Sequence, residues 1–228
     1  MSQRLFARLN ALSGLFGVII LITSFIINPG PPQAHPTAEQ LTAFGQAHYT
    51  QITAGAWMQA VGTVLCIVFA VAIVHLDGAT ARFAGWMTLY GGTLLVTTSL
   101  VEVGFYLTAT TGVYPNIALI SLDFIHAIQR LYFIVTSAAI FLPLGIVILG
   151  GRSLPKALGY AALLLAAAFT ALGLIGLFTQ VQTVDDIVGS VQGVWWFAAT
   201  IALLIRAGRF SATRIETFAT PATQPAGV

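Results

Sequence analysis

The strongest constraint on the fold of this chain is a succession of long apolar segments separated by short polar ones. They lie at 11–27, 53–76, 83–108, 117–150, 157–179 and 187–205. A helix of about 20 apolar residues is enough to cross the hydrocarbon core of a bilayer. Of the 228 residues, 57% are hydrophobic and only 7% are charged, which excludes an ordinary water-soluble surface. The sequence therefore predicts an all-α, polytopic membrane protein with about six transmembrane helices.

The positions of the basic residues predict how the chain is oriented in the membrane. Cytoplasmic loops retain Lys and Arg. With the N-terminus in the cytoplasm, every basic residue outside the apolar segments falls on the cytoplasmic side; these residues are Arg4, Arg8, Arg82, Arg152, Lys156, Arg206, Arg209 and Arg214. We therefore predict a multi-pass protein of the cell (inner) membrane with both termini in the cytoplasm. Residues 1–210 form one transmembrane domain, and 211–228, rich in Ala, Thr and Pro, form a disordered cytoplasmic tail.

The longest connection between apolar segments, residues 28–52, lies on the extracytoplasmic side in this orientation. It begins with a Pro-rich turn and continues with a sequence typical of a helix. Thr37 is placed as an N-cap, and Gln40, three residues later, is the partner expected in a capping box. We predict an outer amphipathic helix that leads into the second apolar segment.

Four ionisable residues inside the apolar segments require an explanation. An unpaired charge at mid-membrane costs at least about 3 kcal/mol, so such groups face the interior of a bundle or a water-filled cavity. In the fourth segment, Asp123, His126 and Arg130 are spaced so that they share one helix face. In the third, Glu102 repeats with Tyr106 at an interval of four residues. We expect both polar faces to point into the bundle.

Two further segments carry polar and small residues at helical periodicity. The face of the second segment contains His48, Gln51, Gly55, Gln59, Gly62 and Cys66, and that of the sixth contains Asp185, Gly189, Gln192 and Trp196. Small residues allow helices to approach closely in lipid, and Gln can form hydrogen bonds between helices. Most of these groups fall in the extracytoplasmic half. The sequence thus predicts a polar cavity open to the outside, with Arg130 at its floor, paired with Glu102 or Asp123.

Two functions remain open at this point. In the first, the protein binds or carries a small molecule in the polar cavity, whose candidate residues are Glu102, Asp123, His126, Arg130, Gln59, His48, Tyr106 and Gln192. In the second, the same residues form a ligand-free ion-pair network in a structural or accessory subunit, which contacts a membrane partner or a second copy of itself. The scattered basic residues do not favour nucleic acid as a partner.

Enzymatic and cofactor chemistry receive little support from the spacing of the chemically active residues. No HxxxH or HExxH pair is present, so neither a metal site nor catalytic residues are predicted. His126 and His48 are the candidates for axial ligands if haem b binds between helices. Cys66 is the only cysteine and is expected to pack as a small apolar residue.

A short motif follows the fourth apolar segment. Its residues are Leu154, Pro155, Lys156, Ala157, Leu158, Gly159 and Tyr160. This entry to the penultimate helix resembles the corresponding turn in a family of bacterial six-helix integral membrane proteins of unknown function. An Arg-flanked first helix, a polar outer loop and an Ala-rich fifth helix extend the resemblance over most of the chain. The resemblance implies a six-helix architecture and no particular activity.

Overall fold

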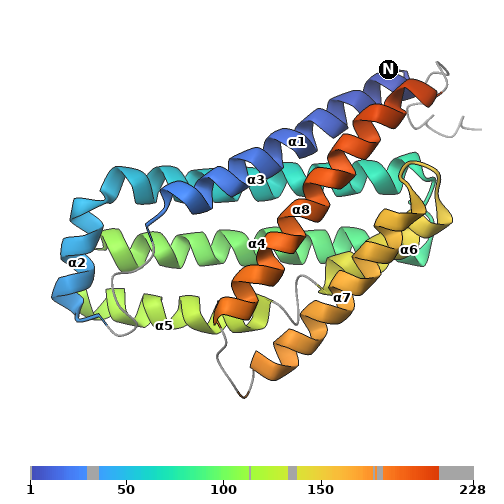
Figure 1. Ribbon diagram of the computed structural model, residues 1–228. Coiled ribbons are helices and arrows are strands. Elements are labelled where there is room, and N and C mark those ends of the chain that lie inside the picture. Colours follow the sequence, from blue (N-terminus) through green and yellow to red (C-terminus); the bar gives the residue numbers. More distant parts are fainter. Residues whose placement is uncertain are drawn as a thin grey trace, which may run out of the picture.

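A computed structural model of the chain shows a bundle of helices (Figure 1). It describes residues 2–29, 36–112, 114–132, 138–176, 178 and 182–210, with the backbone only at 115, 130, 131, 176, 182–188 and 209. Within this part of the chain the regular elements are helices, which confirms the predicted all-α class. The predicted tail, 211–228, and the Pro-rich residues 30–35 lie outside the described residues.

The helices follow the predicted apolar segments with one difference. Their bounds are α1 Gln3–Ile27, α2 Ala38–Ala47, α3 Tyr49–Leu76, α4 Phe83–Thr111, α5 Pro115–Leu131, α6 Ala138–Gly150, α7 Lys156–Gly176 and α8 Gln182–Arg206. Among the described residues, four helices are long and apolar enough to cross a membrane: α1, α3, α4 and α7. The predicted single segment 117–150 corresponds instead to two shorter helices, α5 and α6, and the residues between them, 133–137, lie outside the described ranges.

Helices α1 and α3 pack closely because glycines line their contact. A Cβ atom at Gly62 would lie 2.9 Å from the carbonyl oxygen of Gly17, and one at Gly17 would lie 2.8 Å from Cβ of Leu65. Small residues remove the side-chain layer that otherwise separates two helix backbones. The small face predicted for the second apolar segment is therefore used, at Gly62, for contact with α1.

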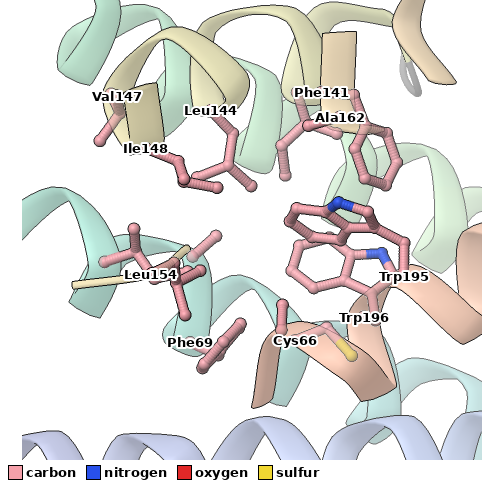
Figure 2. Close-up of a cluster of buried hydrophobic side chains, with 14 of the residues drawn as sticks. Cys66, Phe69, Phe141, Leu144, Val147, Ile148, Leu154, Ala162, Trp195 and Trp196 are labelled. Carbon is pink, nitrogen blue, oxygen red and sulfur yellow. The ribbon is translucent and has the colours of Figure 1, made fainter. Parts of the chain in front are cut away.

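An aromatic cluster fills the centre of the bundle between α3, α6, α7 and α8 (Figure 2). The rings of Trp195 and Trp196 on α8 lie 5.1 Å apart, between Phe141 of α6 and Phe69 of α3. Phe141 is fully buried, with ring centroids 5.1 Å from Trp195 and 5.9 Å from Phe169. Cys66, also buried, packs within this cluster as expected for a small apolar group. These rings hold α8 against the other helices.

Asp77, just after α3, links two turns by hydrogen bonds at one end of the bundle. Its Oδ1 atom accepts hydrogen bonds from the backbone N–H groups of Arg152 and Ser153, each at 2.7 Å, and its Oδ2 accepts one from the Ser153 hydroxyl at 2.7 Å. Charge-assisted hydrogen bonds of this length are among the stronger ones in proteins. The α3–α4 turn and the α6–α7 turn are thereby joined, and Arg206 at the end of α8 donates to the Arg152 carbonyl at 3.4 Å.

The basic residues gather at the same end, which we call the basic end. In Figure 1 the start of α1, the α3–α4 and α6–α7 turns and the end of α8 lie at the upper right, and α2 lies at the opposite end. The basic end carries Arg4, Arg82, Arg152, Lys156 and Arg206. The basic residues of the described turns and helix ends thus lie at one end of the bundle.

Helix α2 begins with the predicted capping box. The Thr37 hydroxyl accepts from the backbone N–H of Gln40 at 3.3 Å, and the Gln40 side chain accepts from the Thr37 N–H at 2.8 Å. A turn at His48 separates α2 from α3, so the two helices run in different directions (Figure 1). Gly45 of α2 lies directly on the end of α4, where an added Cβ would overlap the carbonyl oxygen of Thr110.

Replacing Gly45 by Ala is expected to loosen α2 from α4, because the rigid carbonyl of Thr110 leaves no space for a methyl group. Overpacking of this kind costs about 1–3 kcal/mol. Hydrogen exchange measured by mass spectrometry should show protection in α2 falling by about tenfold or more, with little change in α3. Gln46→Ala, an exposed position on the same helix, is the matched control. Unchanged exchange in α2 would contradict this account of the contact.

Candidate functional site

The candidate site is centred on Glu102 of α4, where side chains from three helices meet. The carboxylate accepts a hydrogen bond from Nε2 of Gln59 on α3 at 3.2 Å and another from Nε2 of Gln129 on α5 at 3.0 Å. A carboxylate without a proton only accepts hydrogen bonds, so the amide nitrogens of both Gln residues must face it. The structure brings together Glu102 and Gln59, both singled out in the sequence, and adds Gln129.

A cavity of about 190 Å³ lies beside the Glu102 carboxylate. One water molecule needs roughly 15 Å³ by this measure, so the space accepts a molecule larger than water. The walls come from α1 and the residues that follow it, and from α3, α4 and α5. They combine polar side chains with apolar ones. They consist of Phe25, Asn28, Pro29, Gln59, Glu102, Val103, Tyr106, Ile125 and Gln129.

Asn28 contributes an unpaired acceptor to this wall. It caps the end of α1, where its backbone N–H donates to the Ser24 carbonyl at 3.0 Å, and its side chain packs against Gly55 of α3. Its Oδ1 atom is buried and has no hydrogen-bond partner among the residues that the structure describes. A buried acceptor left in this state costs about 1–3 kcal/mol. A molecule in the cavity that donates a hydrogen bond would remove that cost.

Tyr106 closes the cavity at the end of α1. Its hydroxyl donates to the Pro29 carbonyl at 2.8 Å, and this bond ties the segment after α1 to α4. Tyr106 lies one turn beyond Glu102, as the four-residue repeat predicted. With its proton donated to Pro29, Tyr106 acts as a fixed part of the cavity wall.

Toward the basic end, the polar surface stops after one further turn. The hydroxyls of Thr63 and Ser99, both buried, lie 3.2 Å apart between α3 and α4, and Thr63 also donates to the Gln59 carbonyl at 2.8 Å. The next turns of these helices contribute Cys66 and Leu95, buried members of the central apolar cluster. The cavity is therefore closed on this side by packed apolar side chains.

The polar face predicted for α5 does not point into the bundle as a unit. Asp123 is exposed, which corrects the expectation that it faces inward, and His126 is half-buried and does not line the cavity. The face that packs against α2 and α4 is instead the apolar one with Ala118, Leu122 and Ile125. Gln129 continues that face by one turn. Burial of the apolar face against its neighbours sets the rotation of α5 and turns Asp123 outward.

The side chain of Arg130 lies outside the described part of the chain, so its pairing with Glu102 or Asp123 stays a prediction. The side chain of Asp185, predicted on the polar face of the sixth apolar segment, also lies outside the described part. The described polar contacts of Glu102 are the two neutral amides.

His48 and Gln192 lie away from Glu102. His48 occupies the turn between α2 and α3, where a ring nitrogen is 2.8 Å from the Gln51 side-chain oxygen and the ring contacts Phe44 at 4.8 Å. Gln192 of α8 is buried and donates to the Tyr132 hydroxyl at 3.2 Å. Neither residue lines the cavity. The predicted haem ligands, His48 and His126, are thus absent from the cavity wall, and the described residues contain no group of three His, Cys, Asp or Glu that could hold a metal ion.

Asn28 and Gln129 are the residues of the cavity wall that the sequence analysis missed. Gln129 lies four residues after Ile125 and seven after Leu122, so it shares a helix face with these buried residues. In the sequence, an uncharged side chain indicates a functional site less clearly than the charged residues nearby. Asn28 is a polar residue that ends an apolar segment, a common position with no functional meaning by itself. Its contact with Gly55 comes from the folding of α1 onto α3.

No protein-family model, curated protein or solved structure matches this chain. The fold and the site therefore define its class on their own: a helical protein with four helices of membrane-spanning length and a carboxylate held by amides beside a cavity. The resemblance of the 154–160 turn to a bacterial membrane family stays a prediction.

Proposed function

We propose that this protein is a multi-pass protein of the cell (inner) membrane, with both termini in the cytoplasm, and that it binds a small molecule entering the Glu102 cavity from the extracytoplasmic side. The lengths and apolar character of α1, α3, α4 and α7 support membrane insertion. The gathering of basic residues at one end supports the orientation. In this arrangement α5 and α6 together make one crossing, and α8 makes the last.

The observation that carries the proposal is the Glu102 carboxylate beside an open space in an apolar bundle. A charged group at such a depth is costly unless it has a function or a compensating partner. Its two described hydrogen bonds come from uncharged amides, which orient the carboxylate and leave its charge in place. This combination is suited to a ligand that completes the site.

The alternative of a structural subunit with a closed polar network has a weaker basis in these contacts. A network whose only task is to join helices would pair its buried polar atoms and fill the space between them. Here Asn28 Oδ1 is buried and unpaired, and a cavity of about 190 Å³ adjoins the carboxylate. Both features favour a binding site.

The surroundings of the cavity support entry from the extracytoplasmic side. Asn28 and Pro29 stand at the end of α1 that is remote from the basic end. In the other direction, beyond Thr63 and Ser99, the apolar cluster blocks passage. The route to water that remains leads away from the cytoplasm.

The proposal predicts that a cysteine introduced at Gln129 will react with a membrane-impermeant maleimide added to intact cells or right-side-out vesicles. Reaction requires water, since the thiolate does not form in lipid. The matched control is Leu164→Cys on α7, which is 72% exposed at the side of the bundle and should face lipid. We expect labelling at 129 to be about tenfold faster or more.

Tyr49→Cys and Arg152→Cys report the two membrane sides in the same experiment. The first should be labelled from outside, and the second only after permeabilisation. The wild-type chain, with its single buried Cys66, gives the background. If Gln129→Cys reacts no faster than Leu164→Cys, or reacts only from the cytoplasmic side, the proposed outward-facing cavity is wrong.

A further inference from the structure

The free polar atoms that Glu102 and Asn28 present to the cavity are hydrogen-bond acceptors. A carboxylate has about four lone-pair sites, and the described side chains fill two of them, with the amides of Gln59 and Gln129. Asn28 Oδ1 is a buried acceptor that no described group of the chain donates to. A ligand that completes this site must therefore bring N–H or O–H donors, and the carboxylate favours a positive charge on the same group.

The amides of Gln59 and Gln129 and the Tyr106 hydroxyl, also in the wall, already donate to Glu102 and Pro29, and the other side chains of the wall are apolar. Phe25, Val103 and Ile125 offer hydrocarbon surface, and the rings of Phe25 and Tyr106 adjoin the cavity. Aromatic faces attract cations. A bare metal cation such as Na⁺ or Ca²⁺ prefers to be surrounded by oxygen ligands on all sides, and the Phe25, Val103 and Ile125 side of this wall offers hydrocarbon. An anion would meet the negative charge of Glu102. An organic cation satisfies the acceptors with its charged end and the walls with its carbon atoms.

We propose that the ligand of the Glu102 cavity is a small organic ammonium ion, a protonated primary or secondary amine with a short apolar group. Its N–H donors bind the Glu102 carboxylate and Asn28 Oδ1, and its alkyl part packs on Val103 and Ile125. The cavity volume of about 190 Å³ restricts the ligand to a few carbon atoms. This inference rests on the proposed function and names the substrate class of the same site.

The test uses the full-length protein in detergent micelles or nanodiscs, with n-butylammonium chloride as the probe. Binding is followed by the midpoint of thermal unfolding and by calorimetric titration. A ligand that binds only the folded state raises the midpoint in a saturable manner. Three matched probes separate the requirements: tetramethylammonium chloride has the charge without N–H donors, 1-butanol has the alkyl chain without the charge, and sodium chloride controls for ionic strength.

We expect saturable stabilisation by butylammonium and at least about tenfold weaker binding of the other probes. Glu102→Gln, which keeps the size of the side chain and removes its charge, should weaken butylammonium binding by about tenfold or more, and Asn28→Ala by several-fold. Glu39→Gln, an exposed carboxylate on α2, should bind as the wild type does. If Glu102→Gln does not fold, Asn28→Ala and the probe series still decide the question.

Three results would overturn the inference: no saturable effect of butylammonium, an equal effect of tetramethylammonium or sodium, or unchanged binding in the folded variants. The labelling experiment distinguishes failure of the proposed outward-facing cavity from failure of the proposed ligand class. Labelling of Gln129→Cys from outside, together with no butylammonium binding, would keep the outward-facing cavity and reject the ligand class. Absence of labelling would reject both.

Discussion

Replacing Asp77 by Ala should destabilise the protein by about 3 kcal/mol, because it removes three hydrogen bonds to a carboxylate at once. Two of the donors left behind belong to Ser153, which is fully buried and has no access to water. The change also separates the α3–α4 turn from the α6–α7 turn. The free energy of unfolding, measured by titration with a denaturing detergent from a lipid-like micelle, checks the expected loss.

Asp77→Asn is the matched control for this experiment. The Asn carbonyl oxygen can still accept from the N–H groups of Arg152 and Ser153, and the amide N–H can donate to the Ser153 hydroxyl. We expect the free energy of unfolding of Asp77→Asn to fall by less than half as much as that of Asp77→Ala. A change of less than about 0.5 kcal/mol for Asp77→Ala would show that these hydrogen bonds contribute little to stability.

Replacing Phe141 by Ala should have an effect of similar size, about 3 kcal/mol, for a different reason. Helices in lipid gain little from the hydrophobic effect, so their association depends on close packing. Phe141 is fully buried and contacts Trp195, Trp196 and Phe169 at ring-centroid distances of 5.1–5.9 Å (Figure 2). Its removal leaves a cavity beside both Trp rings. Near-ultraviolet circular dichroism of the Trp signals, recorded with the unfolding titration, should report their loosening.

Phe83→Ala supplies the comparison, since Phe83 is 81% exposed at the start of α4. It should change stability by no more than about 0.5 kcal/mol. Equal losses for the two variants would mean that the aromatic cluster does not hold the helices together more than the surface does.

The sequence predicted the helices well where the signal is local. The capping box of Thr37 and Gln40 places the start of α2, because both hydrogen bonds join residues three apart in the chain. The apolar segments predict both ends of α3, α4 and α7 to within about one turn. Helices α1 and α8 begin earlier than predicted, at Gln3 instead of 11 and at Gln182 instead of 187. Hydropathy does not distinguish one long helix from two consecutive ones, so 117–150 was expected as a single helix. The structure divides this range into α5 and α6.

The candidate site was predictable only in part, because it depends on how each helix is rotated. Glu102, Gln59 and Tyr106 follow from polar residues at helical spacing, and the structure brings them to one cavity. For α5, the spacing of the charged residues predicted a polar inner face, whereas packing against α2 and α4 buries the neighbouring apolar face. Gln129, an exposed residue one turn further along that face, donates to the Glu102 carboxylate. The contact between Asn28 and Gly55 depends on the crossing of α1 over α3, which no local pattern specifies.

The cavity has one wall that differs from the others in how it is attached. α1, α3 and α4 pack along much of their lengths, and Asp77 fixes the turn between α3 and α4 to the α6–α7 turn. α5, which supplies Ile125 and Gln129, packs instead on α4 and on the outer helix α2 through the Leu41 cluster. A ligand that pushes on Ile125 or draws Gln129 toward itself therefore acts on α5, and through Leu41 on α2. Binding of the proposed ligand would then change the packing of α2, at the end of the bundle opposite the basic end.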